Sequence, residues 1–287
     1  MVMNEHAPVI VIGAARSGTK FLRNVLGSAK GVCTVPYDIN YVWRYGVEDW
    51  PNDVLDPETL SAERIDYIRN TIYSLAHADP TDLIVEKTVS NTLRVPFVDK
   101  VFPDARYVHL IRDGHDVVES SMRQWQAKPD WLSLIRKLKE IPFGSRAYIV
   151  WFAKNFLSGL TKGRGGGGVW GPRSPGILSA SANELSLAEL CALQWRESVE
   201  TASRDLKCLK NSSERVFTIK YSDLVKDEEA ISELVAKLKL SGVEEIMDYY
   251  KRTRSLPTGN AWKSLPQKDQ EVISAIVDGL SSKELVL

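Results

Sequence analysis

The 287-residue sequence has few cysteines, no excess of either charge and no long apolar run. Its three cysteines, Cys33, Cys191 and Cys208, are scattered and form no CxxC pair. This spacing argues against a disulfide framework or a zinc site and is typical of a reducing compartment. Lysine plus arginine and aspartate plus glutamate number 37 each, so no global field favours nucleic acid or an anionic membrane. Any anion site must therefore be local.

The apolar runs are too short for a signal peptide or a membrane span. The first, Val9–Ile12, follows a short polar N-terminus, and the longest later run is AYIVWFA at residues 147–153. We therefore expect a soluble, cytoplasmic protein with no membrane span and no nucleic-acid partner.

Short β-branched runs alternate with amphipathic helical patterns, which is typical of a mostly parallel sheet flanked by helices. With 44% hydrophobic residues, a chain of this length can bury the core of a large domain. The predicted fold class is therefore α/β, in a single domain over residues 1–287. We expect strands at residues 9–12, 32–35, 83–86, 106–111 and 215–220. We expect helices at residues 19–29, 63–77, 115–127, 184–210, 228–240 and 267–280.

The alternation is lost between residues 131 and 181, which include the stretch TKGRGGGGVWGPRSPG. Such a glycine run resists regular structure, because glycine loses the most conformational entropy on ordering. We expect a mobile loop around residues 161–181, inserted in the domain. Two interpretations stay open: a lid that closes over bound substrate and excludes water, or a surface excursion without a role.

The stretch VIVIGAARSGTKFL near the N-terminus predicts a buried strand, a glycine-containing turn and a helix. Such a turn brings backbone N–H groups and a helix N-terminus to one point, where they bind an anion. Arg16 lies in the turn, and the hydroxyls of Ser17 and Thr19 can donate to phosphate oxygens. The triphosphatase order Gly-Lys-Ser/Thr, whose hydroxyl binds Mg²⁺, is absent, since Phe21 follows Lys20. Two cations in place of a metal favour a less highly charged group.

A second stretch, YVHLIRDGHDVVESSMRQW, predicts a buried strand ending at Arg112, a turn and a helix that carries Ser120. Ligands of open parallel sheets bind at the carboxyl ends of the strands, so Arg112 and Ser120 are candidates for holding a second phosphate. Ser121 is the alternative if the helix register shifts by one. A salt-bridged surface arginine and an ordinary helix serine are the other interpretation.

Together the two stretches resemble the sulfotransferases that use 3′-phosphoadenosine 5′-phosphosulfate (PAPS), of the bacterial, carbohydrate or tyrosylprotein type. RSGTK is similar to that family's 5′-phosphosulfate loop, Lys/Arg-Ser/Thr-Gly-Thr-Thr, with Lys20 in place of the second threonine. Arg112 followed eight positions later by Ser120 is similar to its 3′-phosphate motif. The resemblance implies the P-loop-like sulfotransferase architecture, with PAPS as co-substrate and no metal ion.

Weaker similarities extend to the end of the chain. TIKYSDLVKD resembles the family's Tyr-Glu-Asp-Leu segment, which places Tyr221 near the adenine, and RSLPTGNAWKSLP resembles the C-terminal loop over the 3′-phosphate. That loop has one extra residue here, between its glycine and its tryptophan. The cofactor-binding residues that the resemblance implies are Arg16, Ser17, Gly18, Thr19, Lys20, Phe21, Arg112, Ser120, Tyr221, Arg254, Gly259, Trp262 and Lys263.

The resemblance also implies catalytic roles. Arg16 occupies the position of the family's catalytic lysine or arginine, and charge stabilisation at the departing oxygen carries much of the catalysis in such transfers. Asp38 lies where carbohydrate- and tyrosine-sulfating relatives carry a glutamate base, with His115 as the alternative. The other interpretation of Asp38 is a residue that only caps a turn. Lys87 matches a position that contacts the sulfuryl group or the acceptor, and Glu86, Asn91 and Arg94 are candidates for orienting it.

The sequence therefore predicts an enzyme that transfers a sulfuryl group from PAPS to an acceptor hydroxyl, on a carbohydrate or a small molecule. Two other functions stay open. One is a P-loop kinase that uses ATP and Mg²⁺, and the other is a non-catalytic nucleotide-binding module with the same fold.

Overall fold

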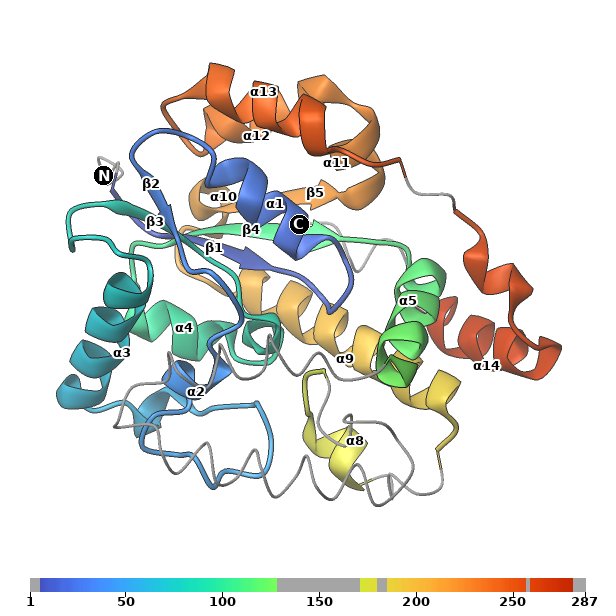
Figure 1. The fold of residues 1–287 in the computed structure, drawn as a ribbon. Helices are drawn as coiled ribbons and strands as arrows, with labels where there is room; N and C mark the ends of the chain where they lie inside the picture. The colour runs from blue at the N-terminus through green and yellow to red at the C-terminus, as the bar shows by residue number, and fades with distance from the viewer. Residues whose placement is uncertain (1–5, 128–170, 180–184, 257–258, 281–287) are drawn as a thin grey trace.

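The computed structural model describes residues 6–127, 171–179, 185–256 and 259–280. Within this part of the chain, the strands form one parallel sheet in the order β2-β3-β1-β4-β5 (Figure 1). They are β1 (Val9–Ile12), β2 (Val32–Thr34), β3 (Leu83–Glu86), β4 (Arg106–Ile111) and β5 (Val216–Lys220). The predicted α/β class with a parallel sheet is confirmed, and each strand lies within one residue of its expected bounds.

The central strand β1 pairs with β3 on one side and β4 on the other, with Val9 opposite Val85 and Arg106. Every residue of these three strands is buried, as expected for parallel strands covered on both faces. Because all five strands run in one direction, their carboxyl ends meet at the same edge. The segments that follow β2, β3, β1, β4 and β5 therefore leave the sheet there in that spatial order.

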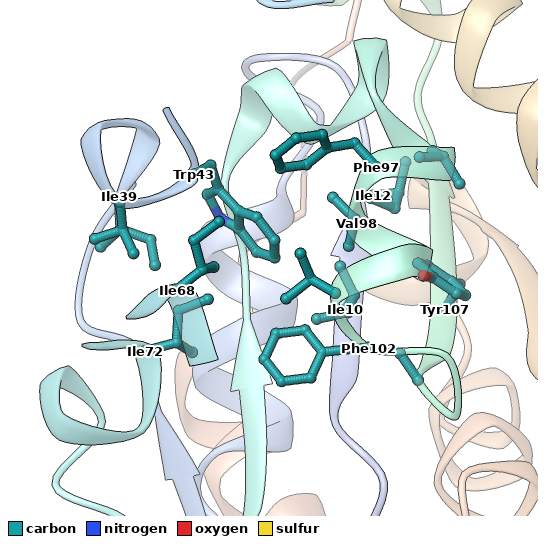
Figure 2. Packing of buried hydrophobic residues seen from close by; sticks show 14 of the residues in the cluster. Ile10, Ile12, Ile39, Trp43, Ile68, Ile72, Phe97, Val98, Phe102 and Tyr107 are labelled. Atoms are coloured by element: carbon teal, nitrogen blue, oxygen red, sulfur yellow. The ribbon is translucent and has the colours of Figure 1, made fainter. Parts of the chain in front are cut away.

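One face of the sheet is covered by α3, α4 and α9, which pack on Ile10 and Ile12 of β1. These helices are α3 (Ala62–Leu75), α4 (Val95–Val101) and α9 (Leu187–Lys207). Figure 2 shows Trp43, Phe97 and Phe102 gathered around this part of the core.

The opposite face is covered by α1, α12 and α13, which pack on Val9 and Val11. In Figure 1 these helices lie above the sheet, whereas α3, α4 and α9 lie below it. They are α1 (Thr19–Leu26), α12 (Glu228–Lys237) and α13 (Val243–Thr253). A further cluster joins α5 (Gly114–Gln126) and α14 (Gln267–Val277) to α9.

All six expected helices are present, each within three residues of its expected bounds at either end. Their starts follow local signals: Ser186 and Glu189 form a capping box at α9, and Asp113 caps α5. The sequence prediction missed α4 and α13. It also missed the short elements η1 (Pro57–Thr59), α2 (Asn40–Trp43), η2 (Val89–Leu93), α8 (Pro175–Ser179), α10 (Ser212–Arg215), α11 (Tyr221–Lys226) and η4 (Ala261–Ser264).

The expected loop at residues 161–181 lies mostly outside the described residues, as does Trp170, so the lid hypothesis stays a prediction. Its described end is held by Asp53, a carboxylate that is 1% exposed. Asp53 accepts from the Arg173 backbone N–H at 2.9 Å, and the Asp53 N–H donates to the Arg173 carbonyl at 2.8 Å. A buried ion pair with Arg44 completes this anchor, and α8 follows it.

Nowhere in the described part of the chain is a helix both long and apolar enough to cross a bilayer.

Candidate active site

The loop after β1 has the backbone geometry of an anion-binding turn. Arg16 (φ 68°) and Gly18 (φ 94°) both adopt left-handed conformations, and the Ser17 N–H donates to the Ala14 carbonyl at 3.1 Å. Gly18 is the N-cap of α1, and no side chain caps the first N–H groups of this helix. A helix N-terminus without a side-chain cap offers donors and a partial positive charge to an anion.

The buried hydroxyl of Ser17 is the next feature of this loop. Ser17 is 1% exposed, and its Oγ has no hydrogen-bond partner within the described residues. Burying a hydroxyl without a partner costs free energy, so such an atom fits a site completed by a bound oxygen.

The two motifs, distant in sequence, are in direct contact. Arg16 Nε donates to Ser120 Oγ at 3.0 Å, although the two residues are 104 positions apart. Arg112 Nη1 donates to the Arg16 carbonyl at 3.1 Å, so the arginine after β4 braces the turn after β1. The neighbouring Ser121 instead lines a small void together with Ala15 and Trp195. The helix register therefore directs Ser120, and not Ser121, toward Arg16.

Positive charge accumulates at this point. Burial and then the charges of Arg123 and Arg112 lower the pKa of Arg16 from its usual value. The guanidinium nonetheless stays protonated at neutral pH, because arginine has so high an intrinsic pKa. The Nε of Arg112 is buried without a hydrogen-bond partner in the described residues. Like charges brought together in this way are relieved by a bound anion.

Tyr221 closes the loop on the side of β5. It begins α11 directly after β5, and its ring lies 4.6 Å from the guanidinium carbon of Arg112. A Cβ placed on Gly18 would come within 2.4 Å of Cε2 of Tyr221. Only glycine allows the aromatic ring to approach the turn this closely.

The remaining residues assigned to the nucleotide make other contacts. Phe21 packs its ring 6.2 Å from that of Tyr250 on α13, and Arg254 pairs with Glu228 at 3.1 Å while lying over the same tyrosine ring. Thr19 is buried under the turn, whereas Lys20 is exposed.

The C-terminal segment returns to the start of α5. Trp262 of η4 lies with its ring 4.3 Å from the ring of His115, and Lys263 beside it is exposed. His115 in turn lies 3.4 Å from carboxylate oxygens of Asp113 and Asp278. Its contacts thus place His115 among residues of α5, η4 and α14. Gly259, with φ 58°, precedes η4 and has open space where a Cβ would point.

The exits of β2 and β3 bring Asp38 and Lys87 together. Lys87 Nζ donates to Asp38 Oδ2 at 2.8 Å, and the Val89 N–H donates to Asp38 Oδ1 at 2.9 Å. The lysine side chain is 7% exposed, whereas that of Asp38 is 45% exposed. The carboxylate is thus fixed from one side and open to solvent on the other.

Next to this pair lies Glu86, the last residue of β3, with no exposed surface. Burial raises the pKa of Glu86 to about 7, and hydrogen bonds from Thr88 and Trp43 only partly oppose this. The sequence analysis had given Glu86 no more than an orienting role for Lys87. Its signal in the sequence is a carboxylate that ends the otherwise apolar strand Leu83–Glu86.

Arg23 is a residue that the sequence analysis missed. It is 5% exposed on the buried side of α1, and its Nη1 donates to the Val35 carbonyl at 3.0 Å. Burial lowers the pKa of Arg23, while the charges of Asp38 and Glu86 act in the opposite direction. A cation interrupting the apolar face of the helix was the available signal.

Comparison with known proteins agrees with this architecture. Residues 8–154, just over half of the chain, match the model of the Sulfotransferase family. The chain belongs to the sulfotransferase family.

Individual relatives are distant. An uncharacterized protein of Aquifex aeolicus (strain VF5) is 30% identical over 131 residues, which cover 41% of this chain and only 17% of that protein. Sulfotransferase STF9 from Mycobacterium avium shares the fold with a TM-score of 0.54 at 13% identity, covering 96% of this chain and 77% of that one. The sulfotransferase domain of the Synechococcus PCC 7002 olefin synthase aligns with a TM-score of 0.47 at 16% identity, covering 93% and 94% of the two chains.

Substitution of Gly18 tests the close approach of Tyr221. Gly18→Ala introduces a side chain at positive φ and overlaps the tyrosine ring, whereas Gly31→Ala has positive φ and nothing within 4 Å. Gly31→Ala should lower the unfolding free energy by about 1 to 2 kcal/mol through backbone strain alone. Gly18→Ala should cost about 1 to 3 kcal/mol beyond that, through overpacking. Urea unfolding measures both, and equal losses would contradict the packing of Tyr221 against the turn.

Glu86 should make stability depend on pH. Its folded pKa is raised from 4.5 to about 7, so the folded state holds a proton that the unfolded state releases between these values. The unfolding free energy should therefore fall as pH rises through this window, by up to about 3 kcal/mol from this group. Glu86→Gln removes the titration. The difference in unfolding free energy between wild type and variant should change across the window, and a constant difference would show that Glu86 has an ordinary pKa.

Proposed function

We propose that this chain transfers the sulfuryl group of PAPS to a hydroxyl of an acceptor, either a carbohydrate or a small molecule, without a metal ion. The observation that carries the proposal is the contact of the two phosphate motifs through Arg16, Ser120 and Arg112. Surface residues without a shared function would not be expected to contact one another at a helix start that no side chain caps.

The residues present fit such a nucleotide. We expect the 5′ side of the nucleotide to bind at the Ser17 hydroxyl and at the start of α1, which no side chain caps. Gly18, Thr19, Lys20 and the Phe21 N–H complete this part of the proposed site. When bound, PAPS supplies an activated sulfuryl group on a phosphate that leaves readily.

The second phosphate falls to Arg112 and Ser120, beside the aromatic ring of Tyr221. A charge-assisted contact from a guanidinium is about twice as strong as a neutral hydrogen bond. Trp262, whose ring lies against that of His115, and its neighbour Lys263 would cover this side, with Gly259 and Arg254 earlier in the same segment.

Arg16 is the proposed catalytic cation. Its Nε is held by Ser120, which leaves the two terminal nitrogens of the guanidinium to face the charge that develops on the departing oxygen. A cation aimed at this oxygen stabilises the transition state more than the ground state. Because Ser120 also serves the second phosphate, binding of the nucleotide and placement of Arg16 are linked through one hydroxyl.

Asp38 is the proposed base and Lys87 its partner. Each carboxylate oxygen has two lone pairs, so Oδ1 and Oδ2 can hold the acceptor proton while still accepting from Val89 and Lys87. The pair leaves the sheet after β2 and β3, on the opposite side of β1 from Arg112 and Tyr221. The acceptor would therefore approach from the β2–β3 side, and the nucleotide would lie toward β4 and β5.

A P-loop kinase is the less favoured function, because Gly18-Thr19-Lys20 lacks the order in which a hydroxyl after the lysine binds Mg²⁺. A direct experiment separates the candidates: transfer of labelled sulfate from PAPS to a panel of hydroxylated carbohydrates and small molecules, assayed without added metal. Transfer to a member of the panel is expected. Thermal stabilisation by ATP with Mg²⁺ but not by 3′-phosphoadenosine 5′-phosphate would favour the kinase. Binding of that nucleotide without any transfer would favour the non-catalytic module.

Arg112→Ala should distinguish a ligand of the second phosphate from a structural arginine. Loss of a charge-assisted contact should weaken binding of 3′-phosphoadenosine 5′-phosphate far more than binding of 5′-AMP, by about tenfold or more, because any loss with 5′-AMP reports only on the turn that Arg112 braces. Calorimetry measures both. Arg204→Ala removes one positive charge from an exposed arginine on α9 and is the control, expected to alter neither affinity. Equal weakening of both nucleotides by Arg112→Ala would assign the residue to bracing the turn.

Asp38→Asn should lower turnover by about 10²-fold or more, because the amide keeps the size but cannot take the acceptor proton. The affinity for 3′-phosphoadenosine 5′-phosphate should stay within about twofold, since Asp38 lies on the other side of β1. Asp66→Asn, on the exposed side of α3, controls for the loss of a negative charge. Near-normal turnover of Asp38→Asn would reassign the base to His115 or to the substrate itself.

A further inference from the structure

The carboxylate of Glu86 is buried without a cation bound to it. Three neutral groups donate hydrogen bonds to it: Thr88 Oγ1 at 2.5 Å, Asn91 Nδ2 at 3.0 Å and Trp43 Nε1 at 3.4 Å. None of the ion pairs found among the described residues includes it. A buried carboxylate is a costly choice for the end of a core strand, where an apolar residue of similar volume is often at least as stable. Stability alone therefore does not explain this residue.

The Thr88 hydroxyl connects Glu86 to the segment that carries Asp38. Thr88 is 1% exposed, and its Oγ1 accepts from the Ile39 N–H at 3.1 Å. A hydroxyl has a single proton, and here that proton is donated to Glu86 Oε1. The result is a directed chain, Ile39 N–H to Thr88 Oγ1–H to Glu86, in which the carboxylate fixes the orientation of the hydroxyl.

Ile39 directly follows Asp38, so this chain acts on the backbone of the proposed base. The Asp38 side chain is held separately, by Lys87 Nζ and the Val89 N–H. Four consecutive residues at the end of β3, Glu86 to Val89, thus hold the Asp38 turn by its backbone and by both carboxylate oxygens. Of these three hydrogen bonds, only the one from the Ile39 N–H is made to a side-chain hydroxyl. The orientation of that hydroxyl must therefore be fixed by a neighbouring group.

We propose that Glu86 is a positioning residue for the transfer reaction. Through the Thr88 hydroxyl, it holds the Asp38 turn against the end of β3 and so directs the exposed part of the Asp38 carboxylate toward the acceptor. The inference rests on the proposed function, in which Asp38 takes the acceptor proton. This role would explain why an acid is buried at the end of β3, where the fold itself does not require one.

Two substitutions of Thr88 separate positioning from packing. Thr88→Val keeps the shape but deletes the hydroxyl, and Thr88→Ser keeps the hydroxyl. In the serine variant, kcat with PAPS and the best acceptor of the panel should stay within about threefold. In the valine variant, kcat should fall about tenfold or more while KM for PAPS stays within about twofold. Thr218→Val is the matched control: the Thr218 hydroxyl is buried on β5, on the other side of β1 from Asp38, and has no hydrogen-bond partner in the described part of the chain.

A readout independent of turnover follows the Ile39 amide. Its hydrogen exchange, measured by NMR, should be about tenfold or more faster in Thr88→Val than in wild type, and unchanged in Thr88→Ser and Thr218→Val. Glu86→Leu removes the acceptor and Glu86→Gln retains one. The leucine variant should match Thr88→Val in both kcat and Ile39 exchange, and the glutamine variant should lie nearer to wild type. If Glu86→Leu does not fold, the Thr88 variants still decide the question.

The outcomes distinguish this inference from the proposed function. Wild-type protein that transfers sulfate, with unchanged kcat in Thr88→Val, would overturn the positioning role and leave the function intact. Equal loss of kcat in Thr88→Val and Thr218→Val would also overturn it, by reducing the effect to the exchange of a buried hydroxyl for a methyl group. If wild type transfers no sulfate, the proposed function fails, and with it the catalytic part of the inference. Ile39 exchange would then still test the hydrogen-bond chain itself.

Discussion

Parallel pairing on both sides of β1 is the constraint on which the candidate site depends. Five strands that run in one direction must end at one edge, and the order β2-β3-β1-β4-β5 arranges their exits in a row. Asp38, Lys87, the Arg16 turn, Arg112 and Tyr221 follow one another along this edge, although they span most of the described sequence. The buried apolar strands β3, β1 and β4 supply much of the free energy that holds this arrangement, since helices cover the sheet on both faces. The division into an acceptor side and a nucleotide side is a consequence of strand order.

The same edge contains the groups that a stable core would otherwise avoid. Arg16 and Gly18 adopt left-handed backbone conformations, the Ser17 hydroxyl has no partner among the described residues, and Glu86 is a buried acid. Each of these features costs free energy in an isolated protein. They lie at the ends of β3 and β1, within the region where the phosphate motifs and the Asp38–Lys87 pair are found. Their concentration there is what we expect where a scaffold holds polar groups ready for a ligand.

Local sequence signals predicted the sheet and the longer helices accurately, but they failed for other parts. The strand residues are β-branched and bounded by turns, and Ser186 and Asp113 mark helix starts by hydrogen bonds that need only neighbours in the chain. Helix α4 was missed because Pro96 suggests a break, although proline is compatible with the first turn of a helix. Helix α13 was missed because the stretch is short and largely polar on its exposed side. Tertiary packing of Ile246 and Tyr250 stabilises it.

For the site, the sequence by itself determined which residues follow each strand. The turn with Arg16 and Gly18, the arginine after β4 and the acidic residue after β2 are all local facts of spacing. Only the tertiary structure decided which of them meet, because contacts across about a hundred positions depend on strand order and helix register. It selected Ser120 over Ser121, turned Phe21 toward α13, and joined Ile39, Thr88 and Glu86 in one chain of hydrogen bonds. No periodicity encodes such a chain, since its donors and acceptors are supplied by segments that only folding brings together.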